Sequence, residues 1–267
     1  MGDNDADWRY HFRRIKAVRR DMATLDGQRI VLIGASSGIG LATATLAVQR
    51  GAAIVIAARG DERLRTAAAK VGGDTEARCL DATDEEQVRA FFAGLGAFDH
   101  LCTLVPGAST RTQSATSSSS FLDTEPGLFA AVFRNRFWAQ CFAARHGARH
   151  IRPGGSIIFV SNTMPRKVIP SYSAACAASG ALEALARILA LELAPVRVNT
   201  IAPGFVATPG TSLIPGERKR TWDRLVAAQP VSRYGVAAEI AEAILSLMTN
   251  RYATGAILTI DGGYSLT

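Results

Sequence analysis

Cysteine is scarce in this chain, and its spacing argues against two kinds of cross-link. The sequence of 267 residues has four cysteines: Cys79, Cys102, Cys141 and Cys176. They form no C-x-x-C pair and no cluster with histidine, so we expect neither a disulfide framework nor a metal site such as structural zinc. A reducing compartment is the simplest setting for such a chain.

Long apolar runs and nucleic-acid-binding motifs are also missing. No apolar run reaches membrane-spanning length and the N-terminus is polar, so we expect no membrane span, no signal peptide and a cytoplasmic location. The net charge is +7, but no recognition helix, zinc finger or aromatic RNA-binding signature accompanies it. We therefore expect no nucleic-acid partner, and a bound anionic cofactor explains the charge more simply.

Residues 1–26 differ in character from the rest. Acidic residues are followed by the basic stretch WRYHFRRIKAVRR, in which apolar residues recur at spacings of three and four. This pattern predicts an amphipathic helix. The helix either packs on its own domain or a neighbouring subunit, or it docks on a membrane surface or partner.

The remaining residues, 27–267, predict one α/β domain. Seven short apolar runs rich in β-branched residues alternate with stretches long enough for helices: 29–33, 52–58, 76–80, 100–105, 156–161, 196–202 and 256–260. Continuous apolar runs are typical of parallel strands buried on both faces. We predict a Rossmann-like, doubly wound, seven-stranded parallel sheet, with a mobile loop at the serine-rich stretch 109–120.

A glycine-rich loop follows the first of these strands. In IGASSGIG, Gly34 permits a tight turn, while Gly38 and Gly40 permit close approach to a pyrophosphate and to the sheet. The loop opens a helix, whose N-terminal N–H groups bind phosphates. The residues between these glycines belong to the same predicted site: Ser36, Ser37 and Ile39.

The end of the second strand indicates which dinucleotide is bound. Ala58 occupies the place where an acidic residue would hold an NAD ribose, and Arg59 follows it. A guanidinium suits the 2′-phosphate of NADP, so the sequence favours NADP over NAD.

Several motifs in order make the chain resemble the short-chain dehydrogenase/reductase family, of the single-domain type. They are GASSGIG, LDATDEEQV, VRVNTIAPGFVATP and ATGAILTIDGGYSL. The resemblance implies that Asp81, with Ala82, contacts the adenine. It further implies that the nicotinamide is bordered by Pro203, Gly204, Val206 and Thr208, and that Thr208 bonds its carboxamide. Relatives usually form dimers or tetramers, so the resemblance also implies a homodimer or homotetramer.

The catalytic pattern of this family is only partly present. By resemblance, Tyr172 is the tyrosine that gives a proton to the substrate carbonyl, and Asn135 is the asparagine of the proton relay. Cys176 stands where the family has lysine, and Asn162, preceded by Ser161, stands where it has serine. Neighbouring strand residues point to opposite faces, so we expect Asn162 to reach the substrate and its amide N–H to donate to a carbonyl oxygen.

Without lysine, ordinary carbonyl reduction is impaired unless Arg166 or Lys167 takes over its charge. Three functions remain open. The first is an NADPH-dependent reductase of a ketone or related carbonyl, acting on a small molecule. The second is a redox-neutral enzyme that uses Tyr172 and Asn162 for cyclisation, elimination or isomerisation. The third is a catalytically silent NADP-binding or partner protein.

A lid is predicted between residues 208 and 234. By resemblance this segment covers the substrate. Its apolar residues either line a pocket or pack a lid helix against the domain: Leu213, Ile214, Trp222 and Leu225. The sequence does not name the substrate.

Overall fold

The computed structural model describes residues 24–105, 120–213 and 216–267, and its centre is a seven-stranded parallel sheet. The strand order β3-β2-β1-β4-β5-β6-β9 reverses direction at β1 and β4. The strands are β1 Arg29–Ile33, β2 Ala53–Ala58, β3 Thr75–Cys79, β4 Phe98–Thr103, β5 Ile151–Val160, β6 Arg197–Pro203 and β9 Ile257–Ile260. This confirms the predicted fold. The expected helix in residues 1–26 and the loop 109–120 fall almost wholly outside the described ranges.

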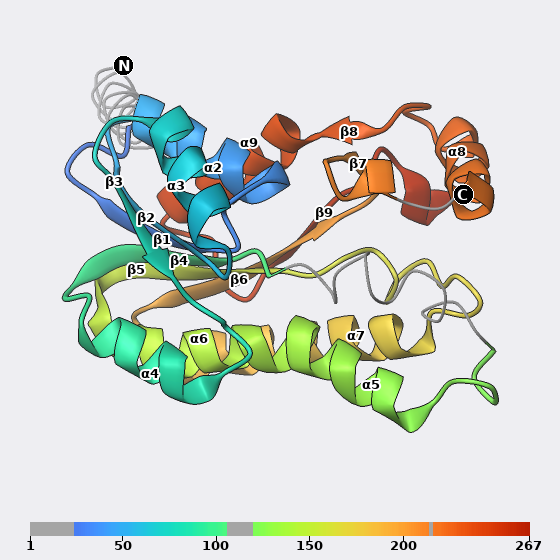
Figure 1. Cartoon of the computed structure of the whole chain (residues 1–267), viewed down its shortest axis with the longest axis horizontal. Helices are drawn as coiled ribbons and strands as arrows, with labels where there is room; N and C mark the ends of the chain where they lie inside the picture. Colours follow the sequence, from blue (N-terminus) through green and yellow to red (C-terminus); the bar gives the residue numbers. More distant parts are fainter. Residues whose placement is uncertain (1–23, 106–119, 214–215) are drawn as a thin grey trace, which may run out of the picture.

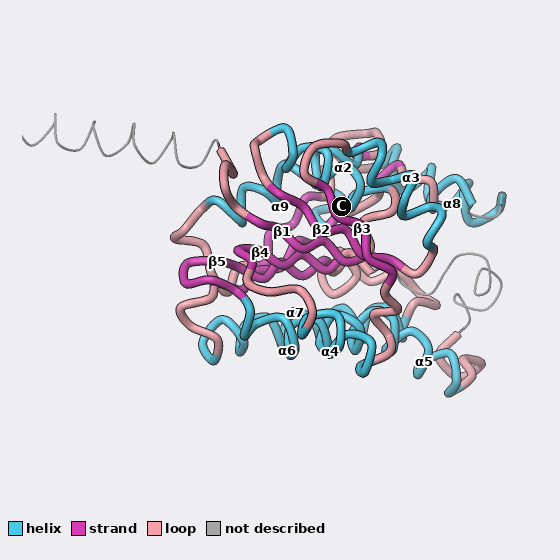
Figure 2. The backbone as a smooth tube through the Cα atoms, turned by 60° about the vertical axis from the view of Figure 1, so that its left-hand side comes forward, coloured by secondary structure: helices cyan, strands magenta, loops and turns pink. Residues whose placement is uncertain are grey.

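Helices cover both faces of the sheet (Figures 1 and 2). One layer contains α2 Gly38–Gln49, α3 Asp61–Val71 and α9 Ala237–Thr249. The other contains α4 Glu85–Ala93, α5 Pro126–Phe133, α6 Ala139–Gly147 and α7 Ser173–Glu192. A π-helical turn, Arg134–Trp138, joins α5 to α6. The parallel crossovers require this arrangement, because each crossover helix must return over one face of the sheet.

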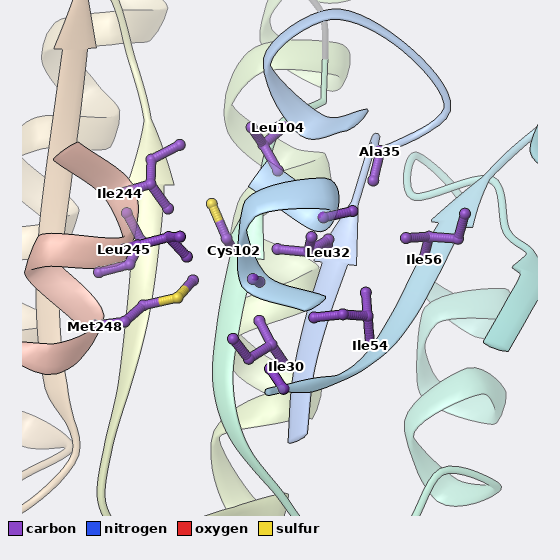
Figure 3. Packing of buried hydrophobic residues seen from close by; sticks show 14 of the residues in the cluster. Ile30, Leu32, Ala35, Ile54, Ile56, Cys102, Leu104, Ile244, Leu245 and Met248 are labelled. Atoms are coloured by element: carbon purple, nitrogen blue, oxygen red, sulfur yellow. The ribbon is translucent and has the colours of Figure 1, made fainter. Parts of the chain in front are cut away.

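Two apolar cores result from the alternation of side chains along the strands. Ile30 and Leu32 of β1 pack toward α9, where they share a core with Ile244 (Figure 3). Val31 and Ile33, the intervening residues, pack on the other face with residues of α4 and α6. Both faces are buried, which is why the strands read as unbroken apolar runs.

Helix α7, Ser173–Glu192, is the one helix in the described residues that is long and apolar enough to cross a membrane by length and composition. This property alone does not contradict the expectation of no membrane span. The apolar residues of α7 contribute to the core of the domain. Leu182 and Ala186 are buried in the core beneath the sheet, and α7 packs against β6. A helix that covers the middle of a sheet needs this composition.

A small substructure extends beyond the carboxyl ends of the main strands (Figure 1). It consists of a two-stranded parallel pair, β7 Val206–Ala207 and β8 Gly235–Val236, and helix α8 Gly216–Ala228. The sequence did not reveal this pair, since two-residue strands have no periodicity. α8 is the expected lid helix, and Trp222 and Leu225 pack against Phe205 and Val226. The side chains of Leu213 and Ile214 lie outside the described part.

Candidate active site

The turn from β1 into α2 is built around its glycines. A side chain on Gly34 would collide with the Leu104 carbonyl, and one on Gly40 would lie 2.6 Å from the Gly34 carbonyl oxygen. Gly38 has a φ of +57°, which favours glycine. Ser37 precedes the helix without capping it through its side chain. The first amides of α2 are therefore available to an anion.

A cavity opens beside this turn. Its lining includes most of the predicted cofactor residues together with a residue of the predicted proton relay: Ile33, Gly34, Ser36, Ser37, Ala58, Arg59, Arg63, Leu80, Asp81, Ala82, Thr83, Val105 and Asn135. Ile39 and Gly40 are not part of the lining, because Ile39 packs on the core and Gly40 on the Gly34 backbone. The cavity thus runs from the end of β2 to the π-helical turn.

Two arginines border the cavity at the β2 end. Arg59 follows β2, and Arg63 lies in the first turn of α3. Both are exposed, and within the described ranges neither side chain pairs with an acid. Sequence reasoning missed Arg63, although its spacing of four from Arg59 across the start of a helix is a usable signal. Asp81 is ordered by Thr83, whose hydroxyl donates to it over 2.8 Å.

The opposite end of the site lies at the carboxyl end of β6. Thr208 packs against Gly38, because a Cβ atom added to Gly38 would lie 3.4 Å from the methyl group of Thr208. The Thr208 hydroxyl lies 3.1 Å from that of Thr211. Both threonines line a second cavity with Lys219 and Tyr234. The predicted nicotinamide-side residues Pro203, Gly204 and Val206 lie at the end of β6 and in β7.

Asn162 is held rigidly where β5 ends. Its side-chain N–H donates to the Ser179 hydroxyl over 2.7 Å, and its amide oxygen accepts the Met164 N–H over 2.9 Å. An amide has two N–H groups. The second one of Asn162 has no acceptor among the described residues.

Ser161 takes part in a different network. It is buried, and its hydroxyl donates to Glu183 of α7. Arg166 pairs with the same carboxylate over 2.8 Å. Lys167 lies over the Tyr264 ring, with its nitrogen 5.9 Å from the ring centre. Both cations considered as replacements for lysine are therefore directed elsewhere.

The start of α7 presents three polar side chains at different depths. Tyr172 immediately precedes the helix, and its ring faces the Arg218 guanidinium at 5.9 Å. The Cys176 thiol donates to the Met164 carbonyl over 3.4 Å. Ser179, which contacts Asn162, is seven residues after Tyr172, or about 10 Å along a helix axis. Tyr172 thus lies at the outer end of the site. Sequence reasoning missed Ser179, which has no local signal.

The π-helical turn is anchored to the sheet by Gln140. This fully buried side chain accepts from Thr103 over 2.6 Å and donates to the carbonyls of Arg136 and Val160 over 2.8 and 3.1 Å. The bonds link the turn to the ends of β4 and β5. Asn135, within the turn, donates to the Ala131 carbonyl over 2.8 Å. Sequence reasoning missed Gln140, although a glutamine within the apolar stripe of a helix is a signal that could have indicated a buried polar contact.

Comparison with known proteins identifies the family. The family model described as enoyl-(acyl carrier protein) reductase matches residues 34–265. The chain belongs to the short-chain dehydrogenase/reductase family. It is 35% identical over 260 residues to the L-tagatose-forming galactitol 2-dehydrogenase of Cereibacter sphaeroides, covering 92% of this chain and 98% of that one.

Two further relatives extend the comparison across this family. The cis-4-hydroxycyclohexanecarboxylate dehydrogenase of Sinomonas cyclohexanicum is 32% identical over 244 residues, covering 88% of this chain and 95% of that one. A small-chain dehydrogenase solved in complex with NADPH is 30% identical with a TM-score of 0.75, covering 91% of this chain and 100% of that one. The chain is therefore related over nearly its whole length to short-chain oxidoreductases.

Proposed function

We propose that the protein is an NADPH-dependent reductase of a ketone or a related carbonyl compound. The observation that carries this proposal is the cavity that connects Arg59 and Arg63 with Asn135 through the glycine-rich turn. A related dehydrogenase with 30% identity binds NADPH. The proposed substrate is a small molecule, because cavities with a few polar groups in their lining are typical sites for small ligands.

The residues present fit the cofactor. Gly34 and Ser37 line the cavity, and the first amides of α2, which no side chain caps, are available to a pyrophosphate. Arg59 and Arg63 offer guanidinium groups to a 2′-phosphate, while Asp81 and Ala82 line the same cavity near the adenine. When bound, NADPH supplies the hydride that the carbonyl carbon accepts.

Asn162 is the proposed donor to the carbonyl oxygen. Two hydrogen bonds fix its amide, and the remaining N–H is free to polarise the carbonyl as the hydride arrives. Tyr172 is the proposed proton donor, since its hydroxyl has no partner among the described residues. It approaches from the outer end of the site, and Asn135 remains the proposed relay residue.

Pro203, Gly204, Val206 and Thr208 are proposed to border the nicotinamide. Thr208 is well situated for this role because it packs against Gly38 at the glycine-rich turn. Ser161 is proposed to hold Glu183 and Asn162 in place through its hydrogen bonds. The cavity that joins Arg59 and Arg63 to Asn135 favours a reductase over redox-neutral chemistry, because cyclisation, elimination and isomerisation consume no hydride from NADPH.

A homodimer or homotetramer in the cytoplasm is the proposed state of the protein. Apolar side chains are exposed on the long helices beneath the sheet, including Trp138 at 46% and Leu191 at 75% exposure. Burying such side chains between subunits would remove apolar area from water.

Transfer of deuterium from labelled NADPH to a ketone tests the proposed function. We expect the label on the carbinol carbon of the product. We also expect Asn162→Ala and Tyr172→Phe each to lower kcat by about 100-fold while NADPH binding, followed by fluorescence, is unchanged. NADPH binding without label transfer to any ketone would contradict the proposal. An unchanged rate for Tyr172→Phe would remove that residue from the mechanism alone.

A further inference from the structure

Arg136 is a charged residue whose side chain has no hydrogen-bond or ion-pair partner among the described residues. It lies in the π-helical turn directly after Asn135 and is only partly exposed. Its guanidinium makes no hydrogen bond or ion pair with any residue in the described ranges. Burial also lowers the pKa of this guanidinium.

The position of Arg136 is fixed relative to the active site. Gln140 binds its carbonyl over 2.8 Å and simultaneously binds the Val160 carbonyl at the end of β5. The residue before Arg136 lines the cofactor cavity, and the turn packs against α7. The backbone of Arg136 therefore lies near the carboxyl ends of β4 and β5, beside the residue that lines the cofactor cavity.

The acidic groups around the site are already used. Glu183 pairs with Arg166, and Asp223 binds both Lys219 and the Tyr234 hydroxyl. A third carboxylate, Asp261, accepts two backbone N–H groups. Lys167, in contrast, faces only the Tyr264 ring. None of these three carboxylates is paired with Arg136.

The cofactor phosphates do not supply the missing negative charge. In the proposed function they bind at the glycine-rich turn and beside Arg59, at the other end of the cavity from Asn135. An arginine that is partly dehydrated costs free energy unless an anion pairs with it. A carboxylate matches its planar fork of N–H donors in two parallel hydrogen bonds.

We propose that Arg136 binds a carboxylate of the substrate, so that the protein acts on carbonyl compounds that carry a carboxylate group. Arg136 is then a specificity-determining residue, next to the proposed relay residue Asn135. The test of this inference by substrate turnover rests on the proposed reductase function. Its test by carboxylate binding does not depend on that function.

Paired acids and esters test the proposal. NADPH oxidation is measured with 4-oxopentanoate and 4-oxocyclohexanecarboxylate and with their methyl esters, which differ in charge. We expect the wild type to prefer at least one acid over its ester by about 30-fold or more in kcat/KM. Arg136→Met should abolish this preference through loss of acid turnover, and Arg136→Lys should retain part of it. Arg134→Met removes an exposed arginine from the same turn and should leave the preference intact.

Binding without turnover separates the two proposals. Cyclohexanecarboxylate, which has no carbonyl to reduce, is titrated against the NADPH complex, with cyclohexanecarboxamide as the neutral comparison. If no ketone is reduced but the acid binds the wild type and not Arg136→Met, the reductase proposal fails and the carboxylate site stands. The carboxylate site would be overturned if the wild type showed the same kcat/KM and affinity for acids as for their neutral analogues. It would also be overturned if Arg136→Met and Arg134→Met had the same preference for acids. NADPH binding checks folding, and Arg136→Gln replaces Arg136→Met if the latter does not fold.

Discussion

Arg59 and Arg63 determine the charge at the β2 end of the cofactor cavity. Both are exposed and free of acidic partners among the described residues, so neither is occupied by an internal ion pair. The 2′-phosphate of NADPH carries nearly two negative charges, and NADH lacks this group. We therefore propose that the preference between the two cofactors depends on these two side chains and on the neutral residue Ala58.

Replacing either arginine should weaken NADPH selectively. We expect Arg59→Ala and Arg63→Ala each to raise the Kd for NADPH about 10-fold or more, since each removes a charge-assisted hydrogen bond. The Kd for NADH should stay within about twofold. Fluorescence titration measures both constants. Arg65→Ala is the control, because Arg65 lies on the same helix but is paired with Asp61; a loss of NADPH affinity equal to that of Arg63→Ala would refute the assignment.

At the scale of elements, the π-helical turn between α5 and α6 connects packing with chemistry. It brings Asn135 to the cofactor cavity, and its geometry depends on the single buried side chain of Gln140. That side chain reaches the ends of β4 and β5 through Thr103 and Val160. Hydrogen bonds therefore join the π-helical turn to the ends of β4 and β5, and Asn162 follows closely after the end of β5.

Removing this anchor should affect stability and catalysis together. Gln140→Leu leaves the Thr103 hydroxyl and three backbone groups, the Arg136 carbonyl and the Val160 carbonyl and N–H, without this partner. We therefore expect the free energy of unfolding to fall by about 2 to 4 kcal/mol. The kcat should fall as Asn135 shifts, while NADPH binding at the Arg59 end changes little. Urea unfolding and steady-state kinetics measure these effects. Gln49→Leu, at an exposed helical glutamine, is the control; equal losses in both variants would contradict the anchoring role.

At the scale of the whole molecule, the polar interior at the amino ends of the strands sets the response to acid. His100 is buried between Ser156 and Gln28, whose oxygens lie 2.9 and 2.7 Å from its ring nitrogens. Burial and then the charge of Arg197 lower the pKa of His100 to about 4. In the unfolded chain the pKa is about 6.5. Between these values the unfolded chain binds a proton that the folded protein does not.

The fold should therefore lose stability as the pH falls from about 6.5 toward 4. This histidine alone accounts for a decrease of about 2 kcal/mol in the free energy of unfolding between pH 7 and pH 5. Urea unfolding at a series of pH values measures the slope. His100→Gln removes the titrating group while keeping an amide for hydrogen bonding, and it should flatten the slope over this range. A variant with the same slope as the wild type would show that other groups cause it.

The sequence alone was sufficient for the parts of the molecule that are encoded locally. The glycine-rich turn has its own backbone requirements, and buried parallel strands impose continuous apolar runs, so β1 and the strand count were predictable. The motif order placed the chain in its family. Arg59 was predicted because it directly follows a strand that ends at the cofactor edge, and Asp81 was predicted from the resemblance of its motif to the family; both line the cavity.

Only the tertiary structure decided which distant residues meet. Asn162 and Ser179, and Arg166 and Glu183, are each 17 residues apart in sequence, and both contacts exist because the segment after β5 comes beside α7, which packs against the neighbouring strand β6. The anchoring role of Gln140 and the unpaired state of Arg136 also follow from packing rather than from any local pattern. Periodicity reveals which face of an element is buried. It does not reveal which polar group another element brings to that face, because that depends on the register between elements.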